Sequence, residues 1–185
     1  FGANYQGFLV FTNCPEGGVN NFTTVATNNA LNLNAWNHVA VVRNGTSVLL
    51  FVNGVQCSTT GGTISSTITV NRTSVLRIGR LFTSPTYDFQ SKGYFSNFRV
   101  VKGTAVYTSA FTPPTAPLTA ITNTSLLCLQ DNSFKDNSAN NFTITRNGDT
   151  AVTGFNPFAP TASYSTVING GSMYFDGAGD TLGLA

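Results

Sequence analysis

Two Asn-Gly dipeptides set between apolar runs constrain the fold of this chain more than any other feature of its sequence. Residues 38–43 (HVAVVR) precede Asn44-Gly45, and residues 46–52 (TSVLLFV) precede Asn53-Gly54. Asn-Gly between two apolar runs is the strongest short-range signal for a β-hairpin, because a type I′ turn needs positive φ at both of its central residues. The pattern predicts a hairpin with its turn at Asn44-Gly45 and a second strand that ends at Asn53-Gly54.

The rest of the chain has the same strand-like character. No stretch sustains a helical apolar period over more than two turns, whereas short apolar runs recur between residues rich in Gly, Asn and Pro. These runs are residues 7–12, 64–70, 75–78, 93–101, 125–130, 141–145 and 173–175. The pattern predicts an all-β fold, an antiparallel β-sandwich of the jelly-roll type. Residues 111–118 (FTPPTAPL) interrupt it, because proline removes a backbone donor and fixes φ, so we expect a connector there.

Charge content excludes several classes of protein. Charged residues make up 9% of the chain, far below the usual share of about 25%, and the net charge is only +2. The basic residues are scattered, whereas nucleic-acid binding needs a basic stripe that neutralises several phosphates. No apolar run reaches the length of about 18 residues that a membrane-spanning helix requires. We therefore expect neither a nucleic-acid partner nor insertion into a membrane.

The cysteines and the single histidine do not form the usual Cys/His zinc site, since no Cys-x-x-Cys spacing occurs. Cys14 and Cys57 form one disulfide or remain free thiols, and the sequence leaves both open. Cys128 lies in an apolar run, so we expect a buried small hydrophobic residue. His38 starts a Val-rich run beside Trp36, and we expect it to serve packing and hydrogen bonding.

A set of ordered motifs carries a family resemblance. The motifs are residues 33–43 (LNAWNHVAVVR), 50–54 (LFVNG), 76–79 (LRIG), 93–103 (GYFSNFRVVKG) and 105–114 (AVYTSAFTPP). Together they resemble the laminin G-like, concanavalin A-like lectin/glucanase jelly-roll family over about residues 5–118. The resemblance implies a β-sandwich in which the motif residues Trp36, His38, Arg43, Asn53 and Gly54 are structural. With its Thr/Asn bias, the chain is similar to repeats in phage virion proteins and in large secreted bacterial surface proteins.

Residues 1–118 resemble the back part of a laminin G-like module, and residues 119–185 resemble the front part of one. The similarity to the first strands of a module lies in residues 125–130, 136–145 and 171–180. Two arrangements follow, and both stay open. The strands of the front part complete the same sandwich, or they complete that of a neighbouring subunit, because an unpaired sheet edge accepts an added strand.

Catalytic residues of the kind used by glycoside hydrolases, which occur among relatives of this fold, are not expected. Such hydrolysis needs two positioned carboxyl groups, one as acid and one as nucleophile or base. Glu16 is the one glutamate and lies in a turn-like segment, and the aspartates lie in segments rich in Asn, Gly and Ser. We predict that the protein is not an enzyme.

Two small groups of residues are candidates for binding. Asp176 and Asp180 bracket a Gly-Ala-Gly segment, and the resemblance implies a calcium site there, since some laminin G-like modules bind calcium through aspartates. The alternative is that both are ordinary turn residues. Tyr87, Asp88 and Tyr94 are candidates for a glycan site, because a sugar ring stacks its C–H face on an exposed aromatic ring. The alternative is that the aromatic side chains belong to the core. Apart from calcium, we expect no cofactor.

These observations favour a non-enzymatic structural or adhesive module of an extracellular assembly, such as a phage virion appendage or a secreted filament. Its expected partners are further copies of itself or neighbouring repeats, joined by strand exchange, and cell-surface glycans. The expected location is extracellular, at a cell surface or in a virion. The alternative is a lectin-like, carbohydrate-binding module that acts as a monomer.

Overall fold

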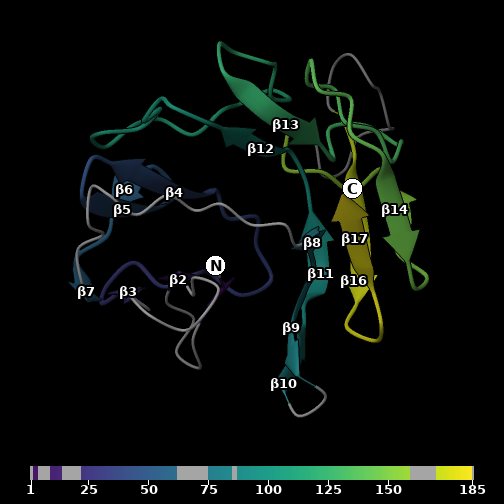
Figure 1. Ribbon diagram of the computed structural model, residues 1–185, viewed down its shortest axis with the longest axis horizontal. Coiled ribbons are helices and arrows are strands. Elements are labelled where there is room, and N and C mark those ends of the chain that lie inside the picture. Colours follow the sequence, from purple (N-terminus) through teal and green to yellow (C-terminus); the bar gives the residue numbers. More distant parts are fainter. Residues whose placement is uncertain are drawn as a thin grey trace. The chain divides into compact units, whose positions relative to one another are not determined.

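The strands of the computed structural model pair in antiparallel fashion, and none of its described residues is helical. The structure describes residues 2–3, 9–13, 22–61, 75–84, 87–158 and 170–184. The predicted all-β fold is therefore confirmed, and the described part contains no helix that could span a membrane. The chain forms two compact units, and Figure 1 labels most of their strands. Unit 1 consists of Phe1–Thr73 and Ala105–Pro113, and unit 2 consists of Ser74–Thr104 and Pro114–Ala185.

The described residues of unit 1 form two sheets of short strands. One sheet has the strand order β1-β2-β3-β7, and the other has the order β4-β5-β6. The strands are Gly2–Ala3 (β1), Leu9–Asn13 (β2), Phe22–Ala26 (β3), Val39–Asn44 (β4), Ser47–Val52 (β5), Val55–Gln56 (β6) and Thr59–Gly61 (β7). The predicted hairpin corresponds to β4 and β5, whereas the strand predicted at residues 64–70 lies outside the described residues.

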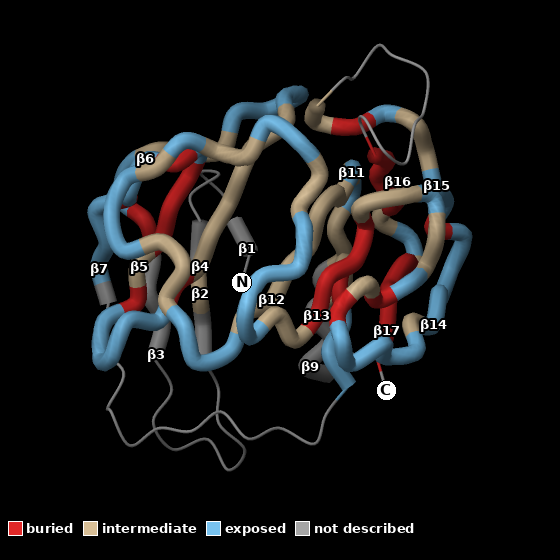
Figure 2. Tube along the Cα trace, turned by 90° about the horizontal axis from the view of Figure 1, so that it is seen from above, coloured by how far each residue is buried: buried red, intermediate tan, exposed pale blue. Residues whose placement is uncertain are grey.

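Strand β5 is covered on both faces, which explains its near-continuous apolar sequence. On one face it contributes to a core cluster whose buried members are Ala26, Val48, Leu50, Val52 and Cys57. On the other face, the ring of Phe51 lies against those of Tyr107 and Phe111, with ring centroids 6.5 and 5.4 Å apart. Figure 2 shows β5 among the buried strands of unit 1.

The second Asn-Gly dipeptide forms a hairpin turn and does not merely end a strand. Asn53 and Gly54 both have positive φ, 51° and 79°, and they connect β5 to β6 with Val52 paired to Val55. Two positive φ values in a two-residue loop are the signature of a type I′ turn.

The first dipeptide forms a different turn from the predicted one. Asn44 pairs with Ser47, so the turn residues are Gly45 and Thr46, and of these only Gly45 has positive φ, 61°. The type I′ turn expected at Asn44-Gly45 is therefore wrong, because a glycine with positive φ at the first turn position is typical of type II′. The Nε group of Arg43 donates a hydrogen bond to the carbonyl of Gly45 at 3.1 Å, which holds the turn.

His38 and Asn53 fasten the start of β4 to the end of β5. The backbone amide of His38 donates to Oδ1 of Asn53, and the amide of Asn53 donates to the carbonyl of His38, both at 2.8 Å. The ring of His38 packs edge-on against Tyr107 and Phe111, with centroids 6.1 and 5.4 Å apart. Trp36 is half-buried in the loop that leads into β4. His38 and Asn53 thus contribute to packing and to backbone hydrogen bonding, while the structural role of the whole motif stays a prediction.

Gly54 lies where two backbone segments of unit 1 meet. The amide of Phe111 donates a hydrogen bond to the carbonyl of Gly54 at 2.9 Å. A Cβ atom on Gly54 would lie 1.9 Å from the carbonyl oxygen of Phe111. The contact brings Ala105–Pro113 onto the β4-β5-β6 sheet, and no side chain can occupy this position without moving that segment.

We expect Gly54→Ala to lower the free energy of unfolding by about 3 kcal/mol or more, since the methyl group meets a backbone carbonyl and the residue keeps a positive φ. Urea unfolding followed by tryptophan fluorescence measures the loss. Gly45→Ala is the matched control, because Gly45 has a similar φ but open space around it, and should cost only about 1 kcal/mol. Equal losses for the two variants would contradict the close contact with Phe111.

Unit 2 has four groups of paired strands within the described residues, with the orders β10-β9, β11-β16-β15, β12-β13 and β14-β17-β8. The strands are Leu76–Ile78 (β8), Arg80–Ser84 (β9), Tyr87–Gln90 (β10), Lys92–Phe95 (β11), Phe98–Val101 (β12), Thr124–Cys128 (β13), Ile144–Asn147 (β14), Ala151–Thr153 (β15), Ser172–Asp176 (β16) and Thr181–Leu184 (β17). Residues 111–118 form no strand, as their prolines predict.

The strands that follow residue 118 pair within the chain. Strand β13 pairs with β12, β16 with β11, and β17 with β8. All three pairs lie within unit 2. The division of the sequence at residue 118 into parts of two modules stays a prediction, as does strand exchange with a neighbouring subunit.

Strands β16 and β17 occupy the middle positions of their sheets and supply much of the core of unit 2, as the buried segments in Figure 2 show. The buried members of this core are Ile78, Leu126, Cys128, Leu129, Met173, Phe175, Leu182 and Leu184. The predicted burial of Cys128 is confirmed, and burial raises the pKa of its thiol to about 12. Cys57 and Cys128 are free thiols, while Cys14 lies outside the described residues.

The run at residues 93–101, predicted as one strand, is two strands in different sheets. The chain breaks at Ser96-Asn97, where Asn97 has a φ of 56°. Ser96 donates a hydrogen bond to the carbonyl of Gly171 at 2.7 Å, and the amide of Leu118 donates to Oδ1 of Asn97 at 2.7 Å. Side chains thus satisfy backbone groups at the point where the chain passes from one sheet to the next.

A buried carboxylate fastens the loop after β13. Asp136 is 1% exposed and accepts hydrogen bonds from the amides of Leu127, Ser138 and Phe142 at 3.0, 2.8 and 3.0 Å. The hydroxyl of Ser138 donates a further bond at 2.8 Å. Burial acts to raise the pKa of Asp136, but these hydrogen bonds outweigh it and hold the pKa below its ordinary value.

Because the folded-state pKa of Asp136 is lowered, its carboxylate stabilises the fold above the unfolded-state pKa of about 4, and this contribution disappears as the pH falls through the folded-state value. We expect Asp136→Asn to cost about 2–3 kcal/mol at neutral pH, since an amide donor would face groups that themselves donate. Urea unfolding between about pH 2 and pH 7 tests this. The difference in free energy of unfolding between variant and wild type should become smaller as the pH falls. A free-energy difference that does not change with pH would show that the ionised form of Asp136 is not required.

We expect deletion of residues 164–185 to unfold unit 2, since it removes β16 and β17 from the centre of two sheets. Loss of the near-ultraviolet circular dichroism signal and of protected amides in unit 2 would show this. A deleted chain that stays folded but no longer assembles would instead support strand exchange between subunits.

Candidate functional site

The β11-β16-β15 sheet presents an exposed aromatic face. Tyr94 of β11 pairs in register with Tyr174 of β16, and their ring centroids lie 5.0 Å apart. Phe155, just after β15, places its ring 4.8 Å from that of Tyr94. Tyr94 is 44% exposed and Phe155 is 40% exposed, whereas Tyr174 is half-buried. We call these three residues the aromatic face.

The alternation of side chains along a strand creates this face. In β16, Met173 and Phe175 are fully buried, so Tyr174 between them points to the opposite side. In β11, Phe95 packs against Phe175 with ring centroids 5.0 Å apart, which leaves Tyr94 on the outer side. The same two strands therefore serve the core and the surface.

Of the residues predicted to bind a glycan, Tyr94 lies on the aromatic face. Tyr87 and Asp88 belong to β10 by their backbone, and their side chains lie outside what the structure describes. Sequence reasoning missed Tyr174 and Phe155. Alternation within residues 172–176 (SMYFD) could have identified Tyr174, but the loop position of Phe155 offered no comparable signal.

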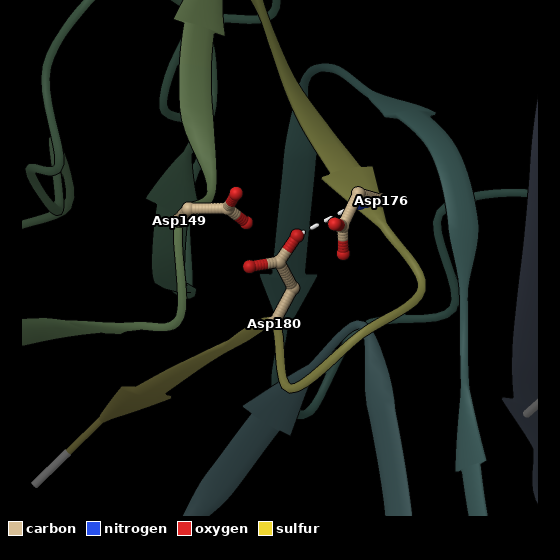
Figure 3. A group of neighbouring side chains, drawn as sticks. All are labelled: Asp149, Asp176 and Asp180. Carbon is tan, nitrogen blue, oxygen red and sulfur yellow. Dashed lines mark hydrogen bonds between the residues drawn. The ribbon is translucent and has the colours of Figure 1, made fainter.

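Three carboxylates gather beside this sheet. Asp176 ends β16, Asp180 precedes β17, and Asp149 lies in the turn between β14 and β15. One oxygen from each lies within 4.8 Å of the other two, and Figure 3 shows the side chains converging from the two turns. We call these residues the acidic cluster. The structure thus brings together Asp176 and Asp180, as the calcium prediction requires, and adds Asp149.

Asp180 is the enclosed member of the acidic cluster. It is 1% exposed, and its Oδ2 accepts a hydrogen bond from the amide of Asp176 at 2.8 Å, drawn in Figure 3. Burial acts to raise its pKa, but hydrogen bonds from Asp176 and Thr150 outweigh burial and lower the pKa. Even so, no hydrogen bond of normal geometry reaches Oδ1. A Cβ atom on Gly148 would lie 2.3 Å from Oδ1, so any larger residue at position 148 would collide with this oxygen.

The chemistry of the acidic cluster fits a hard divalent cation better than glycoside hydrolysis. Calcium prefers carboxylate oxygens supplied by flexible loops, and here the oxygens come from two turns. A hydrolase needs one carboxyl group held protonated by a raised pKa, with both groups open to the substrate. Asp180 is enclosed, so it is not open to a substrate.

Sequence reasoning missed Asp149. The segment Asn147-Gly148-Asp149 has the composition of an ordinary turn, and the separation of Asp149 from Asp176 along the chain carries no sign of proximity. Only the pairing of β14 with β17, and of β15 with β16, brings the two turns together.

Comparison with known proteins gives one family. The laminin G family model described as the concanavalin A-like lectin/glucanases superfamily matches residues 3–114. The match includes Tyr94 and the motif residues of unit 1, and it ends before the acidic cluster. No curated protein and no solved structure matches the chain.

Proposed function

Because the chain belongs to the concanavalin A-like lectin/glucanase superfamily, we propose that it is a non-enzymatic adhesive module that binds carbohydrate through the aromatic face. The observation that carries this function is the pair of exposed rings, Tyr94 in β11 and Phe155 in the loop after β15, whose centroids lie 4.8 Å apart. Aromatic rings that already pack against each other lose little conformational entropy when a ligand covers them, so they suit recognition of a flat ligand face.

A sugar ring matches the chemistry of this surface. Its C–H face covers aromatic carbon, and burial of apolar surface contributes about 25 cal/mol per Å². Its hydroxyl groups need polar partners at the rim. Lys92 and Asp176, which pair in register two residues along the same two strands from Tyr94 and Tyr174, supply a donor and an acceptor there. Such a site would take neutral sugars with hydroxyls on one edge of the ring.

The adhesive role places the protein outside the cell, with cell-surface glycans as partners. Support for this comes from the low content of charged residues, 9%, and from the family, whose members are typically extracellular and non-catalytic. Incorporation into a virion appendage or a secreted filament, with contacts between copies of the chain, is part of the same proposal.

A glycan array followed by calorimetric titration of the best ligand tests the function. We expect Tyr94→Ala and Phe155→Ala each to weaken binding about tenfold or more, since exposed aromatic anchors commonly carry over 1 kcal/mol of binding energy. Phe142→Ala is the matched control, because Phe142 has the same exposure as Phe155, 40%, but follows the Asp136 loop. It should leave the affinity unchanged.

Two results would overturn this function. One is a folded wild-type chain that binds no glycan on the array. The other is glycan binding that survives both substitutions on the aromatic face. Hydrolysis of a bound β-glucan would separately contradict the non-enzymatic role.

A further inference from the structure

Asn-Gly pairs occur at residues 44–45, 53–54, 147–148 and 169–170. An asparagine followed by glycine is prone to lose ammonia spontaneously, because glycine has no side chain to hinder attack by its own backbone nitrogen. The first three pairs lie wholly within the described residues, whereas Asn169 lies outside them. The fold treats these three pairs differently.

The pair Asn44-Gly45 is open to this reaction. Asn44 is the last residue of β4, and both it and Gly45 are exposed. Among the described residues, no hydrogen bond holds the side chain of Asn44 or the backbone amide of Gly45. A Cβ atom on Gly45 would meet nothing within 4 Å. The side chain of Asn44 therefore has room to fold back over the nitrogen of Gly45.

A positive charge lies beside the same turn. Nε of Arg43 donates a hydrogen bond to the carbonyl of Gly45 at 3.1 Å. The nitrogen of Gly45 must lose its proton before it attacks, which places negative charge in the turn. A neighbouring guanidinium group stabilises that charge and so favours the reaction.

The pair Asn53-Gly54 is held in place. Oδ1 of Asn53 accepts a hydrogen bond from the amide of His38 at 2.8 Å, and Nδ2 donates to Oδ1 of Asn37 at 3.3 Å. Gly54 is buried, and its carbonyl accepts a hydrogen bond from the amide of Phe111. The side chain of Asn53 cannot reach the nitrogen of Gly54 until both of its own hydrogen bonds break.

The pair Asn147-Gly148 is also protected, although both residues are exposed. Nδ2 of Asn147 donates to the carbonyls of Thr145 and Thr181, each at 3.4 Å. A Cβ atom on Gly148 would lie 2.3 Å from Oδ1 of Asp180, so this glycine lies against a carboxylate. The negative charge of Asp180 opposes removal of the proton from the nitrogen of Gly148.

We propose that Asn44 is a site of spontaneous deamidation, a self-modification whose only other reactant is water. The nitrogen of Gly45 loses its proton and bonds to Cγ of Asn44. The bond between Cγ and Nδ2 breaks, and Nδ2 takes up a proton and leaves as ammonia. Water then opens the resulting five-membered succinimide at one of its two carbonyl groups. Opening at one carbonyl leaves an aspartate at position 44, and opening at the other leaves an isoaspartate.

The modification changes the end of the β4-β5 hairpin. Both products add a carboxylate next to Arg43 and lower the net charge by one, from +2 to +1. The isoaspartate also adds a CH2 group to the backbone at the point where Asn44 pairs with Ser47, so this terminal pair is lost. Unit 1 therefore accumulates a chemical change with age that involves no residue of the aromatic face.

Incubation of the native full-length chain at mildly alkaline pH, followed by peptide mapping with mass spectrometry, tests this site. We expect Asn44 to deamidate about tenfold or more faster than Asn53, because Asn53 must first break two hydrogen bonds. Asn44 should also react faster than Asn147. Its rate should rise in proportion to the hydroxide concentration, since the deprotonated nitrogen attacks. A native rate at Asn44 that is no higher than that at Asn53 or Asn147 would overturn the proposal.

Unfolding in urea separates the effect of the fold from that of the dipeptide. The three pairs should then react at similar rates, because their structural differences are removed. In the native chain, Asn37→Ala removes the acceptor of Asn53 Nδ2, so it should speed deamidation of Asn53 and leave the rate at Asn44 unchanged. Asn44→Gln should remove the early product, since its longer side chain closes a ring far more slowly. Rate differences that persist in urea would refute control by the fold.

Discussion

The segment that runs from β16 through the following turn to β17 is the part of the chain on which unit 2 depends. Its two strands stand at the centre of separate sheets, and between them they contribute Met173, Phe175, Leu182 and Leu184 to one core. Asp176 and Asp180 lie at the two ends of the turn between the strands, and the outward-facing side of β16 carries Tyr174. This one segment therefore contributes to the core, to the aromatic face and to the acidic cluster, so the placement of the candidate sites depends on the packing beneath them.

This coupling follows from the geometry of a strand. Neighbouring side chains point to opposite faces, so a strand whose inner residues are locked into a core also holds its outer residues in place. Between β11 and β16, Phe95 packs edge-on against Phe175 on the inner face, and Tyr94 lies beside its register partner Tyr174 on the outer face. A shift of one residue between β11 and β16 would bury the tyrosines and expose the core, so the register is strongly specified.

The sequence predicted those features of the fold that depend on residues close together in the chain. The hairpin around Asn44-Gly45, the proline-rich connector and the burial of Cys128 all follow from residues close together in the chain. The turn type at Gly45 differed because the register of β4 and β5 shifted the turn by one residue, and the pattern does not reveal register. The break at Ser96-Asn97 was hidden because the surrounding run is apolar on both sides.

Only some of the residues of each candidate site could be predicted from the sequence. Asp176 and Asp180 stand in one turn, so their spacing suggested a pair, whereas Asp149 joins them only through the pairing of distant strands. Tyr94 stood out as an aromatic residue in a partly alternating run, but its neighbours Tyr174 and Phe155 come from β16 and the loop after β15. Contacts that depend on sheet order are not encoded in spacing along the chain.

The hydrogen bond between Phe111 and Gly54 has a consequence for how such a protein can be taken apart or recombined. The chain leaves unit 1 at Thr73, builds β8 to β12, returns to cover β5 with Ala105–Pro113, and then re-enters unit 2. Each unit is thus encoded by two stretches of gene interleaved with those of the other. Exchange of one continuous stretch of gene cannot transfer either unit alone into another protein. The two units are therefore expected to be inherited together and to evolve as one piece.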